Sequence, residues 1–267
     1  KETTEISELM HYLSFLGLMF NGIHLTHYER FKEADECFNL ALKTMKKGAF
    51  HNRSISDIYL ATRFFSAQNM HKWGNHVLEE THNDIEAMKL YDEAAKSFFL
   101  RAKEMQKLHD IDKDDQLEHS LLYGIYMLTK EGKYKQAERK LNSIRRKFNK
   151  ENLYLFYLYK GYVQKDVKKA VPYFDKAKQH TKNEALVDEK IADYFFSRGK
   201  FKDSIKYFEE RLKLTSKQIY SPELLEESAH QKLCVYYMKE ANLAGSVRER
   251  IIARINESKN IDKEKEQ

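Results

Sequence analysis

The residues best suited to chemistry lie in one polar stretch, HKWGNHVLEETHNDIE, at 71–86. On a helix His76 shares a face with Glu79 or Glu80. Glu79 and His82 have the spacing of an ExxH pair. Di-iron bundles use two such motifs together with two further carboxylates. Because the chain has only one, we interpret the stretch as a polar face near a helix end and expect no metal site.

Other catalytic motifs are absent from the sequence, which has no glycine-rich phosphate loop, no GxSxG and no HExxH. Cys37 and Cys234 lie far apart, form no CxxC motif and have no base that the sequence can identify. That cysteine usage suits a reducing cytoplasm. His24 and His27 fit surface or capping positions around a helix end. We therefore expect no enzymatic activity, no catalytic residue and no cofactor.

The composition indicates helices as the elements that position any site. Hydrophobic residues make up 42 % of the 267 residues and aromatic residues 13 %, enough for a continuous core. Two prolines and nine glycines are too few for an antiparallel sheet protein with many turns. The most apolar stretch, 9–25, carries polar residues and is too short to span a bilayer. It predicts a buried helix and no membrane partner, and the cysteine usage favours a cytoplasmic location.

An internal repeat is the strongest signal in the sequence. The segments 121–144, 154–177 and 188–211 align in one register, with successive copies 33 and 34 residues apart. A small residue lets two helices of a pair approach closely, a large residue one turn later fills the groove between pairs, and an earlier apolar residue plugs the turn. These three sets are Ala137, Ala170 and Ser204; Leu141, Phe174 and Phe208; and Tyr134, Val167 and Phe201.

The turn inside each pair has its own signature. Gly132 and Gly199 stand where the first helix must end and reverse, as expected of a glycine C-cap. The middle copy has Lys165 there, so we expect a less regular turn.

This pattern resembles the tetratricopeptide repeat family over residues 118–217. The family often has a Trp near the start of the first helix and a Pro after the second, and both are absent here. The resemblance implies an all-α, TPR-like helical-hairpin solenoid with a right-handed superhelix. It also implies binding of other polypeptides rather than catalysis.

Weaker copies on both sides bring the expected total to about six helix pairs. We predict helices at 7–20 and 29–45, long helices at 54–80 and 83–107, and a final pair at 222–238 and 243–256. Ser221 and Pro222 provide a helix start for that final pair, which could also be a dimer face. The polar segment LHDIDKDDQ separates two halves. The predicted organisation is 1–108, N-terminal degenerate repeats; 109–117, a polar joint; 118–257, TPR-like repeats; and 258–267, a disordered tail.

Charge is distributed unevenly along the chain. Residues 130–182 carry sixteen Lys and Arg against five Asp and Glu, a net charge of +11 within a total of +6. One interpretation is a solvated outer face. The other is a surface for an acidic partner: a peptide carboxylate, an acidic protein or nucleic acid. We expect nucleic acid to be bound only through a segment upstream of Lys1, where a signal peptide or an N-terminal domain could precede the chain.

A ligand of such a stack would lie on the first helices of the pairs, which line its concave side. Tyr side chains can stack on a peptide, Asn can bond its backbone and Lys can hold its carboxylate. The predicted peptide-binding residues are Tyr126, Lys130, Asn152, Leu155, Tyr159, Tyr162, Asp193 and Phe196.

A narrower resemblance rests on FYLYKGYVQKDVKKAVPYFDKAK and on VDEKIADYFFSRGKFKDSIKYFEERL. Both segments look like the repeats of bacterial peptide-pheromone receptors of the Rap and PlcR kind. That resemblance implies a cytoplasmic quorum-sensing receptor for a short peptide, which controls transcription or a response regulator. The alternative left open is a constitutive scaffold or chaperone that holds a protein partner.

Overall fold

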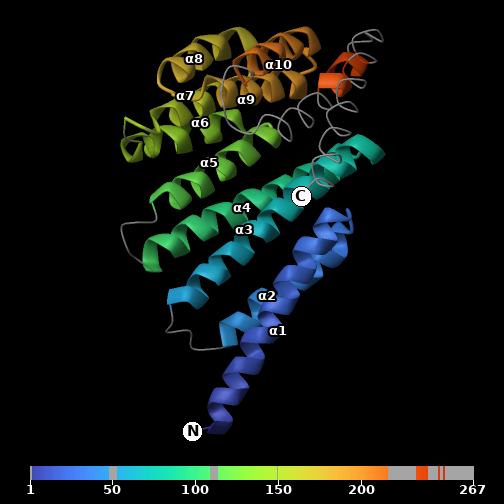
Figure 1. Ribbon diagram of the computed structural model, residues 1–267, viewed down its shortest axis with the longest axis vertical. Coiled ribbons are helices and arrows are strands. Elements are labelled where there is room, and N and C mark those ends of the chain that lie inside the picture. Colours follow the sequence, from blue (N-terminus) through green and yellow to red (C-terminus); the bar gives the residue numbers. More distant parts are fainter. Residues whose placement is uncertain are drawn as a thin grey trace, which may run out of the picture. The chain divides into compact units, whose positions relative to one another are not determined.

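The computed structural model describes residues 2–47, 53–108, 114–148, 150–215 and 233–239, together with Ser246 and Glu249. Across these residues the chain is helical and contains no β-strand (Figure 1). It divides into two compact units, Lys1–Lys147 and Phe148–Gln267. The predicted joint at 109–117 and tail at 258–267 fall mostly or wholly outside the described residues, so the predicted domain boundaries stay predictions.

The first unit consists of three antiparallel helix pairs, in which each helix packs against the next one along the chain (Figure 1). This antiparallel helical-hairpin arrangement agrees with the expected one. The pairs are α1 (Glu2–His27) with α2 (Phe31–Lys47), α3 (Arg53–His76) with α4 (Asp84–Leu108), and α5 (Asp114–Lys130) with α6 (Tyr134–Ser143).

The second unit repeats the arrangement with shorter helices. Its pairs are α7 (Leu153–Tyr162) with α8 (Val167–Gln179) and α9 (Glu184–Ser197) with α10 (Phe201–Thr215). The short helix η3 (Arg145–Lys147) precedes it. Helical residues 233–239 add Leu233 and Tyr236 to the core of α9 and α10. Apart from Ser246 and Glu249, the rest of the predicted final pair, and with it the sixth hairpin, lies outside the described residues.

Burial confirms the repeat register. All members of the small-residue set and of the groove-filling set are completely buried. Ser204 adds a hydrogen bond from its hydroxyl to the carbonyl of Ala192, at 2.9 Å, which joins the helices of that pair. The same spacing in the first pair is also correct, because Phe31, Ala34 and Phe38 are buried there.

The glycine turns also form as predicted. Gly132 and Gly199 have positive φ values of 77° and 66°, a conformation that costs glycine little. Behind Gly132, the amide of Lys133 donates to the carbonyl of Leu128 at 2.8 Å, which satisfies a carbonyl at the end of α5. In the first pair Glu29 takes this place with φ of 60°.

The two helices of the second pair are as long as predicted, but the way in which the first of them ends was not predicted. A π-helical turn, η1 (Val77–Thr81), continues α3, and His82 ends it with φ of 52°. None of the described helices is long and apolar enough to cross a membrane.

Candidate binding site in the N-terminal unit

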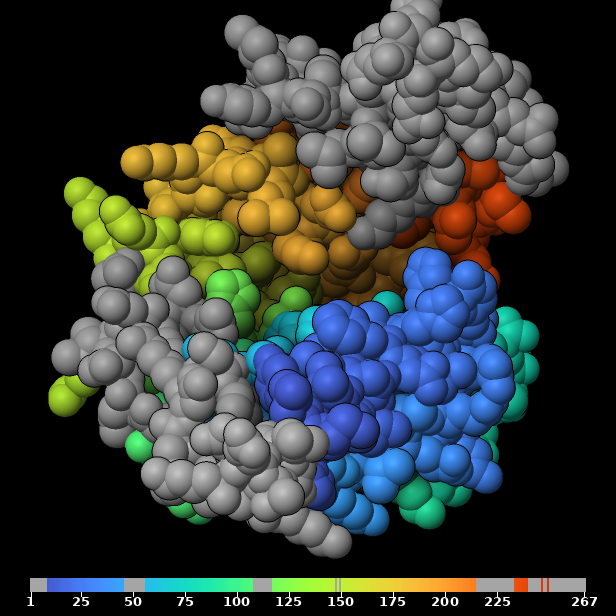
Figure 2. All heavy atoms as spheres, turned by 60° about the horizontal axis from the view of Figure 1, so that its bottom comes forward, coloured from blue at the N-terminus to red at the C-terminus, as the bar shows by residue number. Residues whose placement is uncertain are grey.

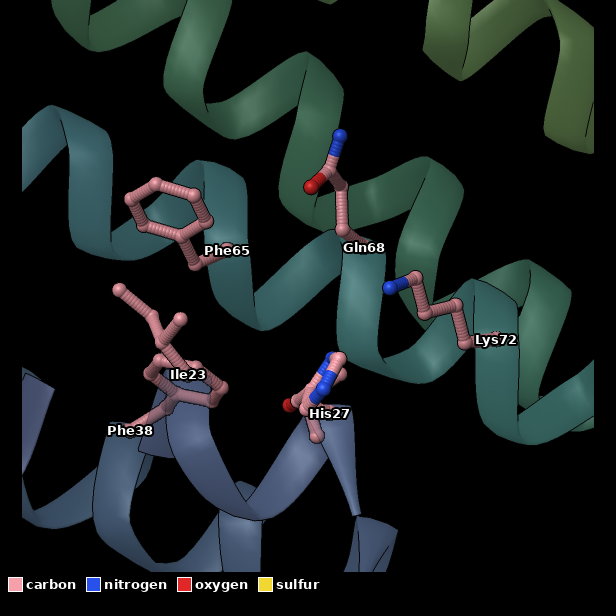
Figure 3. Close-up of a pocket in the computed structure, with 7 residues that line it drawn as sticks. Ile23, His27, Phe38, Phe65, Gln68 and Lys72 are labelled. Carbon is pink, nitrogen blue, oxygen red and sulfur yellow. The ribbon is translucent and has the colours of Figure 1, made fainter. Parts of the chain in front are cut away.

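A hollow of about 180 Å³ lies between α1, α2 and α3 of the first unit (Figure 3). In the view of Figure 3, Ile23, Phe38 and Phe65 gather on one side, and His27 and Lys72 lie on the other. His27 and Lys72 are exposed, and Ile23 and Phe65 are partly buried. The hollow thus has an apolar half and a half that carries cationic and imidazole groups. Its lining residues are Ile23, Thr26, His27, Phe38, Phe65, Gln68 and Lys72.

Close packing between α1 and α2 holds Phe38, one of the lining residues, in place. Gly22 on α1 lies directly against the ring of Phe38, so that a Cβ at this position would be 2.8 Å from Phe38 Cε1. The glycine therefore lets α2 bring a phenylalanine up to the backbone of α1. Thr26 donates to Asn69 Oδ1 at 2.8 Å, and the Asn69 amide donates to the carbonyl of Phe31 at 3.0 Å. These bonds hold α3 at a fixed register on the first pair.

A second group of side chains lies further along the same unit, where α3, α4 and α5 meet. The ring of His71 is edge-on to Tyr126, with centroids 5.8 Å apart, and tilted against Tyr91 at 6.1 Å. The hydroxyl of Tyr91 donates to Asn75 Oδ1 at 2.8 Å. Lys130 Nζ lies 5.6 Å from the ring centre of Tyr126 and 5.9 Å from that of Tyr91. We call these five residues the His71 cluster.

The electrostatics of the His71 cluster keep its imidazole neutral. Burial, with further contributions from Lys130 and Lys72, lowers the pKa of His71 to about 3. Burial also raises the pKa of the Tyr91 hydroxyl, with smaller contributions from Tyr126 and Glu79. At neutral pH the cluster therefore presents neutral hydrogen-bonding groups around one cation, Lys130. Tyr91 is buried and the other four residues are partly exposed, so Lys130 is the group of the cluster that suits an anionic ligand.

The structure places the predicted binding residues in both units. Tyr126 and Lys130 lie together in the His71 cluster of the first unit. Asn152, Leu155 and Tyr159 are partly exposed on or just before α7 of the second unit. For all of these residues, the binding role stays a prediction.

The three remaining predicted residues take part in packing within the second unit. Tyr162 is buried, and its hydroxyl donates to the carbonyl of Lys190 at 2.6 Å. Asp193 accepts a hydrogen bond from the hydroxyl of Tyr236 at 2.6 Å. The ring of Phe196 stacks on Tyr236 with centroids 4.5 Å apart. Their roles in binding likewise stay predictions. In the structure each of the three residues makes a hydrogen bond or a ring contact within the second unit.

None of the residues that line the hollow was predicted from the sequence as a binding residue. His27 was predicted only to lie around a helix end. No single repeat copy contains them, because they come from three helices. A signal was present in the polar stretch 71–86, which begins at His71 and Lys72. Among the described residues, no group of three or more His, Cys, Asp or Glu is arranged to hold a metal ion.

Several lysines of the basic stretch 130–182 are engaged with side chains of their own unit. Lys133 pairs with Asp92 at 2.9 Å, and Lys178 pairs with Asp188 at 2.9 Å. Lys140 Nζ lies 5.3 Å from the ring centre of Phe99. Part of the positive charge therefore serves local packing.

Comparison with known proteins gives structural similarity but no family assignment. No protein-family model and no curated protein matches the chain. Among solved structures, the chain is similar to one in the crystal structure of the APC/C hetero-tetramer Cut9–Hcn1, with 14 % identity and a TM-score of 0.40. The match covers 90 % of this chain and 46 % of the other, so this chain spans less than half of that protein's length. We argue nothing about function from this similarity.

Proposed function

We propose that the N-terminal unit binds a short segment of another polypeptide at the hollow. An apolar side chain of that segment would pack on Ile23, Phe38 and Phe65, and a carboxylate would lie beside Lys72 and His27. The observation that carries this proposal is the division of the hollow into an apolar half and a half with exposed cationic and imidazole groups (Figure 3).

The size of the hollow favours one side chain over a whole small molecule. Pockets for drug-sized ligands enclose about 300 to 1,000 Å³, whereas this hollow encloses about 180 Å³. A single leucine or phenylalanine side chain suits the smaller volume. The main chain that carries it would continue across the surface of the unit.

The His71 cluster supplies a second contact for that main chain. Gln68 and Lys72 at the hollow, and His71 and Asn75 in the cluster, all belong to α3, where His71 directly precedes Lys72 and Asn75 follows Lys72 by three residues. Amide groups such as that of Asn75 can bond an extended backbone, and Lys130 can hold a carboxylate. An extended peptide along α3 would therefore meet polar and cationic groups at both places.

The more specific form of this proposal is an intracellular receptor for a short signalling peptide, whose binding controls a transcription or response-regulator output. Its support is the exposed Lys72 and His27 on one side of the hollow, beside which the terminal carboxylate of a free peptide would lie. The alternative is a constitutive scaffold that holds a protein subunit. A scaffold would copurify with that subunit, whereas a receptor would be isolated empty and would bind short peptides.

The test is a screen of random eight-residue peptides against the 267-residue chain, made once with free and once with amidated C-termini. Trp73, which follows Lys72 and is the only tryptophan, reports binding by fluorescence, and calorimetry gives the affinity. We expect Lys72→Glu to weaken binding about tenfold or more, which is about 1.4 kcal/mol. Lys89→Glu, an exposed lysine on α4, is the matched control and should bind as the wild type does.

Two variants in the second unit separate this site from the other predicted one. If Tyr159→Ala or Asn152→Ala abolishes binding while Lys72→Glu leaves it unchanged, the ligand lies on α7 and the hollow is not the site. If no peptide binds and a protein copurifies, the scaffold is the correct function.

A further inference from the structure

The outward side of α1 is apolar in a way that no described part of the chain accounts for. Met10, Leu13 and Phe20 are 59 %, 52 % and 60 % exposed. Between positions 9 and 28 the chain has no Asp, Glu, Lys or Arg. Figure 2 shows the atoms of α1 and α2, in blue, at the surface of the molecule. The outer side of a surface helix is normally polar, so the apolar residues here are suited to being covered by a partner.

The exposed residues of this side follow a heptad seam. The intervals between them alternate between three and four residues, which is the spacing that brings side chains to one line for a second helix. At the centre, Gly17 faces open space, since a Cβ there would meet nothing within 4 Å. A second helix could therefore approach the backbone closely at this point. The members of this seam, which we call the α1 seam, are Met10, Leu13, Gly17, Phe20 and His24.

The spacing of the residues in the α1 seam is almost symmetric about Gly17. Met10 and His24 are each seven residues from Gly17, and Leu13 and Phe20 are four and three residues from it. A two-fold interface requires such self-complementarity, because residue i of one copy meets residue j of the other and the reverse. An antiparallel crossing at Gly17 would place Met10 opposite His24 and Leu13 opposite Phe20.

The helix dipole favours the antiparallel direction over the parallel one. An antiparallel pair brings the positive N-terminal end of each helix dipole to the negative C-terminal end of the other. A parallel pair would set like ends of the two dipoles side by side.

We propose that two copies of this chain associate through their α1 helices, antiparallel and crossing at Gly17. This surface is separate from the peptide-binding role proposed above and does not depend on it. The dimer would carry one hollow on each copy.

The first test is sedimentation velocity of the 267-residue chain over a range of concentrations. We expect the wild type to form a dimer, and Phe20→Glu or Leu13→Glu to shift it to monomer by weakening association at least a hundredfold. The control is Ile85→Glu on α4, because Ile85 is 73 % exposed and lies outside the seam. Circular dichroism checks that each variant is still helical. A wild type that stays monomeric overturns the proposal, as does a dimer that Phe20→Glu and Ile85→Glu affect equally.

The second test is disulfide trapping in a Cys37→Ser/Cys234→Ser background, which removes both native thiols. Gly17→Cys should crosslink with itself, because the crossing places both copies of this position together. Met10→Cys alone should stay uncrosslinked, but should crosslink when mixed with His24→Cys. Self-crosslinking of Met10→Cys, with none in the mixture, would show a parallel pair and contradict the proposed arrangement. Copurification of another protein that covers α1 in a monomeric chain would replace the second copy as the partner.

Discussion

Thr26 on α1 donates a hydrogen bond from its hydroxyl to Oδ1 of Asn69 on α3, at 2.8 Å. Asn69 is completely buried, and its amide donates in turn to the carbonyl of Phe31 on α2. One amide thus connects α3 to both helices of the first pair. Because Thr26 also lines the hollow, this connection fixes the geometry of the proposed binding site.

We predict that Asn69→Ala destabilises the protein by about 1 to 2 kcal/mol, because it removes the hydrogen bonds to Thr26 and to the carbonyl of Phe31, while the Thr26 hydroxyl keeps the carbonyl of Gly22 as a partner at 2.9 Å. The measurement is urea unfolding followed by circular dichroism. Gln68→Ala is the matched control, since Gln68 is the preceding residue of α3 and is partly exposed at the hollow. Its expected change is within about 0.5 kcal/mol. Equal losses in both variants would show that the Asn69 bonds do not hold α3 in place.

A second prediction concerns acid stability and His71, whose pKa is lowered to about 3 by burial and by Lys130 and Lys72. The unfolded chain binds a proton near the ordinary pKa of 6.5, whereas the folded chain does not. His71 therefore contributes stability above pH 6.5 that is progressively lost as the pH falls toward 3. Since His71 is only partly buried by its exposed area, we expect a loss of roughly 1 kcal/mol between pH 7.5 and 5.5.

The variant His71→Gln keeps a polar side chain but cannot titrate, so its stability should change less over this range. The readout is the difference between wild type and variant in urea unfolding at each pH. Because the other histidines are common to both proteins, that difference isolates His71. Parallel pH profiles for the two proteins would rule out a buried neutral imidazole at this position.

The helix pairs could be predicted from sequence because their signal is local. Ala137, Ala170 and Ser204 recur at a nearly constant interval, and each is buried between the helices of one pair. The two helices of the second pair were also predicted closely, because their apolar periodicity extends over many turns. The π-turn at Val77–Thr81 was missed, since a change in hydrogen-bond register leaves no residue-type signature in one sequence.

The hollow could not be predicted because it depends on where separate helices meet. Ile23, Phe38 and Phe65 each look like ordinary core positions in their own helix. They form an apolar wall only after Gly22 lets α2 close on α1 and Asn69 sets the register of α3. Tyr126 and Lys130 were predicted as binding residues because the first helix of each pair lines the concave side of a helical-hairpin stack. In the structure His71 and Tyr91 lie beside them.

The third prediction concerns the buried ion pair of Lys178 and Asp188 in the second unit. Their charged atoms are 2.9 Å apart, and the side chain of Asp188 is completely buried. Burial raises the pKa of Asp188, and the bond from Lys178 partly opposes this. Lys178→Met would leave the carboxylate buried without its cation. We expect this variant to lose about 3 kcal/mol at pH 7.

A double variant and a pH series separate the ion pair from simple packing. Lys178→Met/Asp188→Leu should recover most of the loss, because no charge remains buried. The folded Lys178→Met variant holds the Asp188 proton more tightly than its unfolded chain does. Its stability relative to wild type should therefore rise as the pH falls from 7 to 5. A double variant that is no more stable than Lys178→Met would mean that the lost packing of Lys178, and not the uncompensated charge, causes the effect.

The last prediction concerns the contact of Gly161 on α7 with Phe174 on α8. A Cβ at Gly161 would lie 2.1 Å from Phe174 Cε1, and Phe174 is completely buried against Tyr162, Tyr194 and Phe195. Alanine raises helix propensity by about 1 kcal/mol over glycine, but overpacking a core costs about 1 to 3 kcal/mol. Because aromatic rings surround the Phe174 ring, we expect the cost of overpacking to exceed the gain in helix propensity. Gly161→Ala should therefore destabilise the protein by about 1 kcal/mol.

A smaller side chain at position 174 tests whether the Phe174 ring causes this loss. In a Phe174→Leu background, which has room for the added methyl group, Gly161→Ala should be neutral or stabilising in urea unfolding. If Gly161→Ala costs the same in both backgrounds, the glycine is required for its backbone and not for the space that it leaves to Phe174.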